Sequence, residues 1–113
     1  MRHLRNILVI VVAILTLFPV TGFATSLSVT WNADTETDLA GYKVYYGLQS
    51  NTYGAPMDVG KATSYQISNI QSGSTYYISV TAYDTSGNES VKSSEVSSYI
   101  PVSDTTPPRV VSR

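Results

Sequence analysis

The chain has 113 residues, which is enough for one small domain. It contains no cysteine, so a disulfide framework, a thiolate metal site, a cysteine nucleophile and a lipid-acylated cysteine are all excluded. Charged residues make up only 13% and the net charge is −1, so neither nucleic acid nor an anionic membrane surface is an expected partner.

The residue usage favours β structure. Nine tyrosines stand out, serine and threonine are abundant, and strong helix formers are sparse. Aromatic, β-branched and hydroxyl side chains suit a pleated, half-buried surface. The composition alone therefore predicts an all-β fold.

The N-terminus has the pattern of a secretory signal peptide. Arg2 and Arg5 precede an apolar run over residues 7–15, and Gly22 and Ala24 supply small residues at the −3 and −1 positions of a cleavage site. We expect a signal helix over residues 1–24 that is removed after Ala24. The alternative is an uncleaved membrane anchor, but about 20 apolar residues are needed to span a bilayer and this run is shorter. Export predicts a secreted, periplasmic or cell-surface protein, with membrane contact only through this segment if it is uncleaved.

Short segments with alternating apolar and polar residues follow the predicted signal. In the first of them Leu27, Val29 and Trp31 alternate with polar residues, and alternation with period two predicts a strand. The six predicted strands are residues 27–32, 41–47, 56–59, 64–70, 75–83 and 93–100. Turn-forming residues separate them, and Asp84 to Glu89 reads as a hairpin loop in which Gly87 supplies a positive φ.

The spacing of these strands predicts a β-sandwich or barrel. Pro101 ends the last strand because it has no N–H for a ladder bond. The domain is therefore expected over residues 25–101, followed by a flexible, proline-containing tail over residues 102–113.

Four motifs together resemble the fibronectin type III family. These are Leu-x-Val-x-Trp at 27–31, Gly-Tyr-Lys-Val-Tyr-Tyr at 41–46, Ile-x-x-Gly-x-x-Tyr-x-Ile-x-Val-x-Ala at 70–82, and the final strand at 94–99. The resemblance implies an immunoglobulin-like sandwich of two antiparallel sheets, with Tyr76 as a tyrosine corner whose hydroxyl returns to the upstream backbone. The expected structural core is Trp31, Tyr42, Val44, Tyr46, Ile67, Ile70, Tyr76, Ile78 and Val80.

Two features depart from the family pattern. Ser72 stands where the corner often has proline, a mild change. More important, the family has a strand before the Trp strand, and cleavage after Ala24 leaves only two residues there, so the first strand is expected to be short or missing. The simplest interpretation is that the domain tolerates the loss of its first strand and leaves that edge of the sheet exposed. Otherwise the tail around Val110 and Val111 folds back, or a partner supplies a strand.

No catalytic, cofactor or metal site is predicted. The lone histidine, His3, lies in the predicted signal, and no nucleophile motif such as G-x-S-x-G is present, so an enzyme is not expected. Asp34, Glu36 and Asp38 lie in one loop, but the glycine and distal glutamate of a calcium loop are missing, which favours a solvated loop.

The outward-facing residues of two strands suggest a binding face. Lys43 and Tyr45 on one strand, and Tyr77 and Tyr83 on another, are expected on the same solvent face of one sheet. Tyrosine offers a large contact area at low entropic cost, although such residues also serve simply as cross-strand pairs. The predicted function is a non-catalytic, exported binding or adhesion module for a protein or polysaccharide. The alternative is a structural spacer or a subunit of a surface or periplasmic assembly, joined through the open sheet edge.

Overall fold

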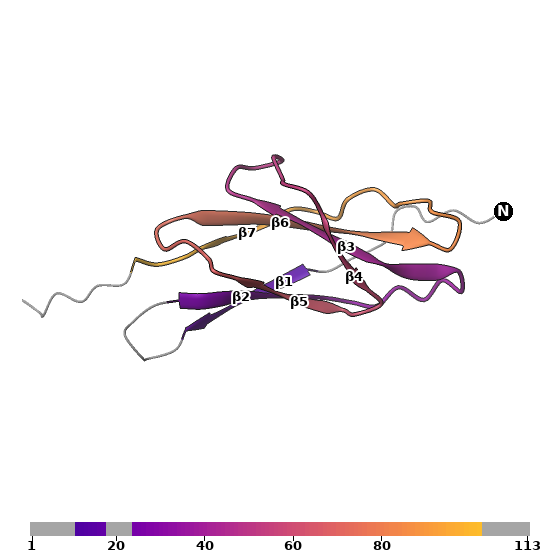
Figure 1. Ribbon diagram of the computed structural model, residues 1–113, viewed down its shortest axis with the longest axis horizontal. Coiled ribbons are helices and arrows are strands. Elements are labelled where there is room, and N and C mark those ends of the chain that lie inside the picture. The colour runs from indigo at the N-terminus through magenta and orange to yellow at the C-terminus, as the bar shows by residue number, and fades with distance from the viewer. Residues whose placement is uncertain (1–10, 18–23, 103–113) are drawn as a thin grey trace, which may run out of the picture.

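The computed structural model describes residues 11–17 and 24–102, and every regular element in these ranges is a β-strand. The strands form a sandwich of two antiparallel sheets (Figure 1), as predicted. One sheet has the order β1-β2-β5 and the other the order β4-β3-β6-β7. The strands are β1 (Val11–Leu17), β2 (Ala24–Trp31), β3 (Leu39–Gly47), β4 (Met57–Gly60), β5 (Ser64–Ser68), β6 (Thr75–Asp84) and β7 (Val96–Tyr99). None of the described residues forms a helix long and apolar enough to cross a membrane.

The alternation in the sequence becomes an alternation of burial. In β2, Leu27 and Val29 are fully buried, whereas Ser28 between them is partly exposed. In β3, Tyr42 and Val44 are buried on either side of the half-buried Lys43. Successive side chains of a strand point to opposite faces, so period two in the sequence gives each sheet one face for the core.

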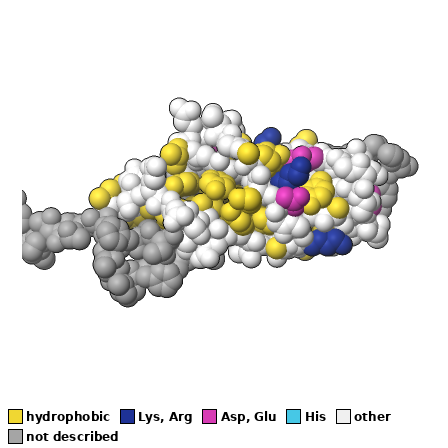
Figure 2. Space-filling model, in the orientation of Figure 1, with side chains coloured by type: hydrophobic (Ala, Val, Ile, Leu, Met, Phe, Trp, Pro, Cys, Tyr) yellow, Lys and Arg dark blue, Asp and Glu magenta, His cyan; other side chains and the backbone are white. Residues whose placement is uncertain are grey.

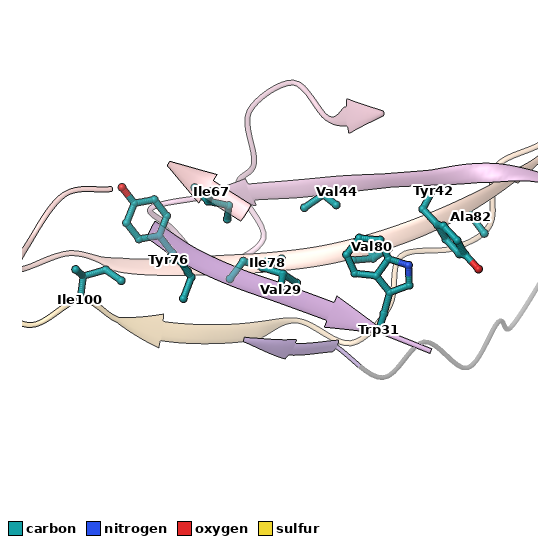
Figure 3. Packing of buried hydrophobic residues seen from close by; sticks show 11 residues of the cluster. Val29, Trp31, Tyr42, Val44, Ile67, Tyr76, Ile78, Val80, Ala82 and Ile100 are labelled. Atoms are coloured by element: carbon teal, nitrogen blue, oxygen red, sulfur yellow. The ribbon is translucent and has the colours of Figure 1, made fainter. Parts of the chain in front are cut away.

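The core lies between the two sheets, and Trp31 and Tyr42 meet at one end of it (Figure 3). Their rings pack edge to face, with centroids 5.6 Å apart. Of the residues expected in the core, Tyr46 and Ile70 are only half-buried and pack against it from the periphery. Among residues 26–102, the buried hydrophobic residues are Leu27, Val29, Trp31, Tyr42, Val44, Ile67, Tyr76, Ile78, Val80, Ala82 and Ile100.

Tyr76 closes the end of the sandwich at which β6 begins. Its ring is buried, and its hydroxyl oxygen accepts a hydrogen bond of 2.9 Å from the backbone N–H of Gln71. Gly73 has a φ of 81°, a conformation that glycine adopts without strain, and its N–H donates to the carbonyl of Ile100 at 2.7 Å. The corner therefore joins the loop after β5, the start of β6 and the end of β7.

The first strand differs from the expectation. The sequence predicts that it is short or missing, with a signal helix upstream, yet Val11–Leu17 forms β1 and pairs antiparallel with β2 from Val11 opposite Trp31 to Leu17 opposite Ala24. The physical reason is that a short apolar run rich in valine and isoleucine suits a signal peptide and a buried strand equally well. Residues 1–10 and 18–23 of the predicted signal, and 103–113 of the predicted tail, lie outside the described residues.

The corner hydrogen bond is tested by removing one oxygen atom. We expect Tyr76→Phe to lower the free energy of unfolding by about 1 kcal/mol or more, because the N–H of Gln71 loses its acceptor. Tyr99→Phe is the matched control, since Tyr99 is 56% exposed, and it should change stability by less than about 0.5 kcal/mol. Equal urea midpoints for Tyr76→Phe and the wild type would contradict the assigned role.

Candidate binding face on the four-stranded sheet

The four predicted binding residues lie on two neighbouring strands. Antiparallel pairing of β3 with β6 places Lys43 opposite Thr81, and Tyr83 and Tyr77 lie toward opposite ends of β6. These residues alternate with the buried ones, so they belong to the outer face of the β4-β3-β6-β7 sheet. In the view of Figure 2, acidic and basic side chains lie next to one another among hydrophobic ones.

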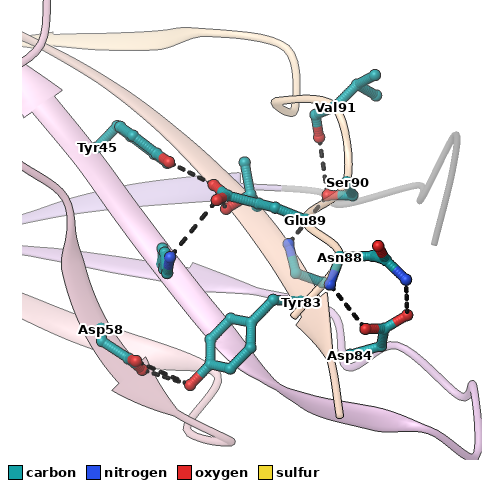
Figure 4. A network of polar contacts seen from close by, with 11 residues as sticks. Tyr45, Asp58, Tyr83, Asp84, Asn88, Glu89, Ser90 and Val91 are labelled. Carbon is teal, nitrogen blue, oxygen red and sulfur yellow. Dashed lines mark hydrogen bonds and ion pairs between the residues drawn. The ribbon is translucent and has the colours of Figure 1, made fainter. Parts of the chain in front are cut away.

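Glu89 is the centre of the polar contacts on this face (Figure 4). Its carboxylate accepts hydrogen bonds from the Tyr45 hydroxyl and, at 2.7 Å, from the Thr81 hydroxyl. The ammonium of Lys43 lies 3.5 Å from the same carboxylate and 5.4 Å from the centroid of the Tyr83 ring. One carboxylate therefore joins side chains of β3 and β6.

A tight hairpin brings Glu89 to that position. The carboxylate of Asp84 accepts hydrogen bonds from the backbone N–H groups of Ser86 and Asn88, at 2.9 and 2.8 Å. Gly87 has a φ of 88°, as the turn composition predicts. The chain then returns along β6, and a β-bridge sets Glu89 opposite Tyr83.

The side chain of Tyr83 lies over Gly41, the residue opposite it on β3. Its hydroxyl donates to the carboxylate of Asp58 on β4, with oxygen–oxygen distances of 2.7 and 2.9 Å (Figure 4). A Cβ atom at Gly41 would lie 2.6 Å from the Tyr83 hydroxyl and 2.9 Å from the carbonyl oxygen of Gly60. The ring occupies this place only because residue 41 has no side chain.

A second carboxylate, Glu95, holds the loop after β3. It accepts hydrogen bonds from the hydroxyls of Ser50 and Tyr53 and, at 2.8 Å, from the backbone N–H of Asn51. The loop crosses Gly47, where a Cβ atom would lie 2.2 Å from the carbonyl oxygen of Thr52. Glycine at this position therefore allows the loop to cover the end of β3.

Tyr45, whose hydroxyl donates to Glu89, makes two further contacts, one with Tyr53 of the loop after β3 and one with Lys92 of the connection between β6 and β7. The ring of Tyr53 lies 6.1 Å from the ring of Tyr45, measured between centroids. The ammonium of Lys92 lies 4.5 Å from the centroid of the Tyr45 ring, within the range of a cation–π contact. We call this set the outer-face cluster: Lys43, Tyr45, Tyr53, Asp58, Thr81, Tyr83, Glu89, Lys92 and Glu95.

The structure thus brings three of the four sequence-predicted residues into one cluster. Tyr77 lies apart from them along β6, opposite Gly47 on β3 and Ser97 on β7. Sequence reasoning missed the loop residues that complete the cluster, notably Glu89, Glu95 and Tyr53. Loop residues carry no periodic signal of which face they cover.

The hydrogen bonds set the charge state of the cluster. Burial raises the pKa of Tyr45 to about 12, and the hydrogen bond and charge of Glu89 act in the same direction. Burial and Glu95 likewise raise the pKa of Tyr53 to about 12. Burial opposes ionisation of Glu89, but hydrogen bonds from Tyr45 and Thr81 outweigh it and lower the pKa of this carboxyl below its usual value. Neutral phenols facing ionised carboxylates are therefore the stable state at neutral pH.

The acidic loop before β3 is held by hydrogen bonds to the strand and within itself. The backbone N–H of Asp34 donates to the Tyr42 hydroxyl at 2.6 Å, and the Asp34 carboxylate accepts from the N–H of Glu36 at 3.4 Å. Over residues 11–17 and 24–102, no three histidine, cysteine, aspartate or glutamate residues are grouped so that they could hold a metal ion. The Asp34 carboxylate therefore has a role in the geometry of this loop.

The family follows from comparison with known proteins. The family model of the fibronectin type III domain matches residues 20–99 of this chain. The chain belongs to the fibronectin type III domain family. The matched range includes β2 to β7 and the tyrosine corner, whereas β1 lies outside it. No curated protein matches the chain.

Several solved structures resemble most of this chain. The chicken CNTN1 FN1–FN3 domains match with a TM-score of 0.64 and 18% identity, over 80% of this chain and 31% of theirs. An Fn3-like protein from Clostridium thermocellum matches with a TM-score of 0.63 and 24% identity, over 81% of this chain and 88% of its own. A β-1,2-glucanase from Parabacteroides distasonis matches with a TM-score of 0.59 and 25% identity, over 69% of this chain and only 11% of the enzyme.

Gly41 is the most direct test of how the cluster is built. We expect Gly41→Ala to cost about 1–3 kcal/mol of stability, because the added methyl group would clash with Tyr83 and with the backbone of Gly60. Gly54→Ala is the matched control, since no atom lies within 4 Å of its Cβ position, and its effect should stay within about 0.5 kcal/mol. The free energy of unfolding of both variants is measured by chemical denaturation. Equal losses of stability in the two variants would contradict the close packing at Gly41.

The carboxylates predict sensitivity to acid. Hydrogen bonds lower the pKa of Glu89, against the effect of burial, and hydrogen bonds from Ser50, Tyr53 and the backbone of Asn51 lower the pKa of Glu95. A depressed pKa in the folded state stabilises the fold above the unfolded-state pKa, and this contribution is lost as pH falls through the folded-state value. We therefore expect thermal stability to fall between about pH 5 and pH 3. The Glu89→Gln/Glu95→Gln double variant should show a flatter decline, and an unchanged slope would contradict the role of these two groups.

Proposed function

We propose that the chain is an exported, non-catalytic binding module that docks a protein partner on the outer-face cluster. The observation that carries the proposal is the fixed arrangement of aromatic rings on one sheet face. Tyr45, Tyr53 and Tyr83 each donate their hydroxyl to a carboxylate, so their rings are already oriented before a partner arrives. Side chains that are ordered in advance lose less entropy on binding, and tyrosine is enriched in such surfaces.

The cations over the rings favour a protein partner. Lys92 lies over the Tyr45 ring and Lys43 lies over the Tyr83 ring. A sugar that stacked flat on either ring would have to displace an ammonium group. A protein surface instead offers carboxylates to the lysines and apolar side chains to the ring edges, as mixed interfaces commonly do.

A polysaccharide partner is the second candidate. It is favoured by the similarity, at 25% identity over 69% of this chain, to part of a β-1,2-glucanase. The domain would then serve as a non-catalytic carbohydrate-binding unit. Tyr77 is the tyrosine of this face that we expect to stack on a sugar, because it lies apart from the carboxylates that hold the other rings.

The lack of histidine and cysteine after Ala24 and the N-terminal pattern support the remaining parts of the proposal. Residues 25–113 contain neither residue, so the most frequent general base and the thiolate nucleophile are missing from them. The basic start, apolar run and small residues up to Ala24 support export.

The binding test uses one central ring and a matched tyrosine outside the cluster. We expect Tyr45→Ser to weaken capture of a partner at least tenfold, because the ring contacts Lys92 and Tyr53 and its hydroxyl holds Glu89. Tyr99→Ser, which removes an exposed tyrosine at the far end of the sheet, should bind like the wild type. The immobilised domain is exposed to the surface-protein fraction of the source cells and to a glycan panel, and affinity is measured for each retained component.

The outcomes separate the two candidates. A retained protein whose binding depends on Tyr45 supports the main proposal, and a retained glycan whose binding depends on Tyr77 supports the second. Tyr45→Ser must keep the melting behaviour of a folded domain for the comparison to count. Binding that survives Tyr45→Ser and Tyr77→Ser in a folded domain removes this face as the site.

A further inference from the structure

We propose that the edge of β2 that β1 occupies is a self-association site: two processed chains pair β2 against β2 after residues 1–24 are removed. This inference rests on the export proposed above. It names a second copy of this chain as the partner and a sheet edge as the site, separate from the outer-face cluster.

The hydrogen-bonding direction of β2 identifies which residues form this edge. The N–H of Trp31 donates to the carbonyl of Thr63 at 3.0 Å, on the side of β5. Backbone groups of alternate residues point to opposite neighbours in an antiparallel sheet, so Leu27 and Val29 also pair with β5. The N–H and C=O groups of Ser26, Ser28 and Thr30 therefore face β1.

The segment that covers this edge lies inside the predicted signal. Strand β1 (Val11–Leu17) occupies the apolar run before the predicted cleavage site at Ala24. The family match begins at residue 20, so β1 contributes nothing to it. Removal of residues 1–24 would take away the strand that pairs with β2 and that also lies against β7 of the other sheet.

From Ser26 to Trp31 the edge itself has no charge, proline or bulge that would prevent pairing, and the one register shift of the β1–β2 ladder lies between Ala24 and Ser26. Residues 24–31 are Ala-Thr-Ser-Leu-Ser-Val-Thr-Trp, with no charge and no proline. Natural sheets protect edges with lysine, proline, bulges or a covering segment. Here β1 is the covering segment, and its removal leaves a neutral row of donors and acceptors matched to another extended strand.

The tail is a poor replacement for β1. Pro107 and Pro108 lack N–H groups, so neither can donate a ladder hydrogen bond in the stretch just before Val110 and Val111. Val110 and Val111 are adjacent, and adjacent residues of a strand point to opposite faces. Only one of them would be directed toward the core beside Leu27 and Val29.

A second copy of β2 fits better, because its own pattern is self-complementary. With Ser28 opposite Ser28 of the other copy, Leu27 lies opposite Val29 and Ser26 lies opposite Thr30. This register keeps apolar residues opposite apolar ones, and it is symmetric about a two-fold axis, as in most homodimers. Ser28 then forms a hydrogen-bonded pair at the axis, because its N–H and C=O both face the edge.

The experiment measures processing and association on the same sample. The full chain is produced in a secreting bacterial host, its intact mass is determined, and its oligomeric state is followed by sedimentation over a range of concentrations. We expect a product that begins at Thr25 and sediments as a concentration-dependent dimer. Ser28→Lys should raise the dimer dissociation constant at least tenfold, because two lysines would lie directly opposite one another at the axis.

The control places the same charge on the other edge of the same sheet. Ser64 on β5 is exposed and belongs to the edge strand opposite β1, so Ser64→Lys should leave the dimer unchanged. A processed product that stays monomeric at every concentration overturns the inference, and so does equal weakening by both lysines. A product that keeps residues 1–24 overturns the self-association, because β1 is then still present to cover β2. A dimer that Tyr45→Ser leaves intact shows that this edge and the proposed binding face are independent.

Discussion

The pairing of β3 with β6 is the constraint on which both faces of the four-stranded sheet depend. Its register sets Tyr42 opposite Ala82 and Val44 opposite Val80, and these residues form the middle of the core. The same register brings Lys43 and Thr81 together on the outside, within reach of Glu89. A slip of one residue would turn the core side chains of one strand outward, so the core holds the outer-face cluster in register as well.

The sequence contains enough information for the sandwich and its corner. Alternation alone locates the strands that carry Trp31, Val44 and Ile78, because each strand has one apolar face to bury. The bond to the Tyr76 hydroxyl was predicted from the resemblance of the 70–82 motif to the fibronectin type III family. Glu89 and Glu95 were not, because their partners on β3 and in the following loop lie more than 40 residues away in the sequence. No local pattern records which loop returns to which strand.

The outer face is more constrained than a row of surface tyrosines would suggest. The hydroxyls of Tyr45, Tyr53 and Tyr83 already donate to carboxylates, so they are not free to seek a ligand. A partner docked as proposed would meet ring edges with lysines above them, on a strand that has glycine at both Gly41 and Gly47. Such a surface favours recognition by shape and charge over recognition through the phenol groups.

The first strand shows why one sequence pattern carries two meanings. An apolar, β-branched run of this length can cross into a secretion channel or can complete a sheet, and nothing in its composition separates the two uses. The two uses exclude each other in time, because a segment removed during export cannot remain paired with β2. Without β1, the remaining strands still pair as β2-β5 and β4-β3-β6-β7, and the corner at Tyr76 is kept. Export would therefore leave a domain whose core elements are present and whose β2 edge is newly exposed, at the point where the chain has left the cell and can meet a second copy.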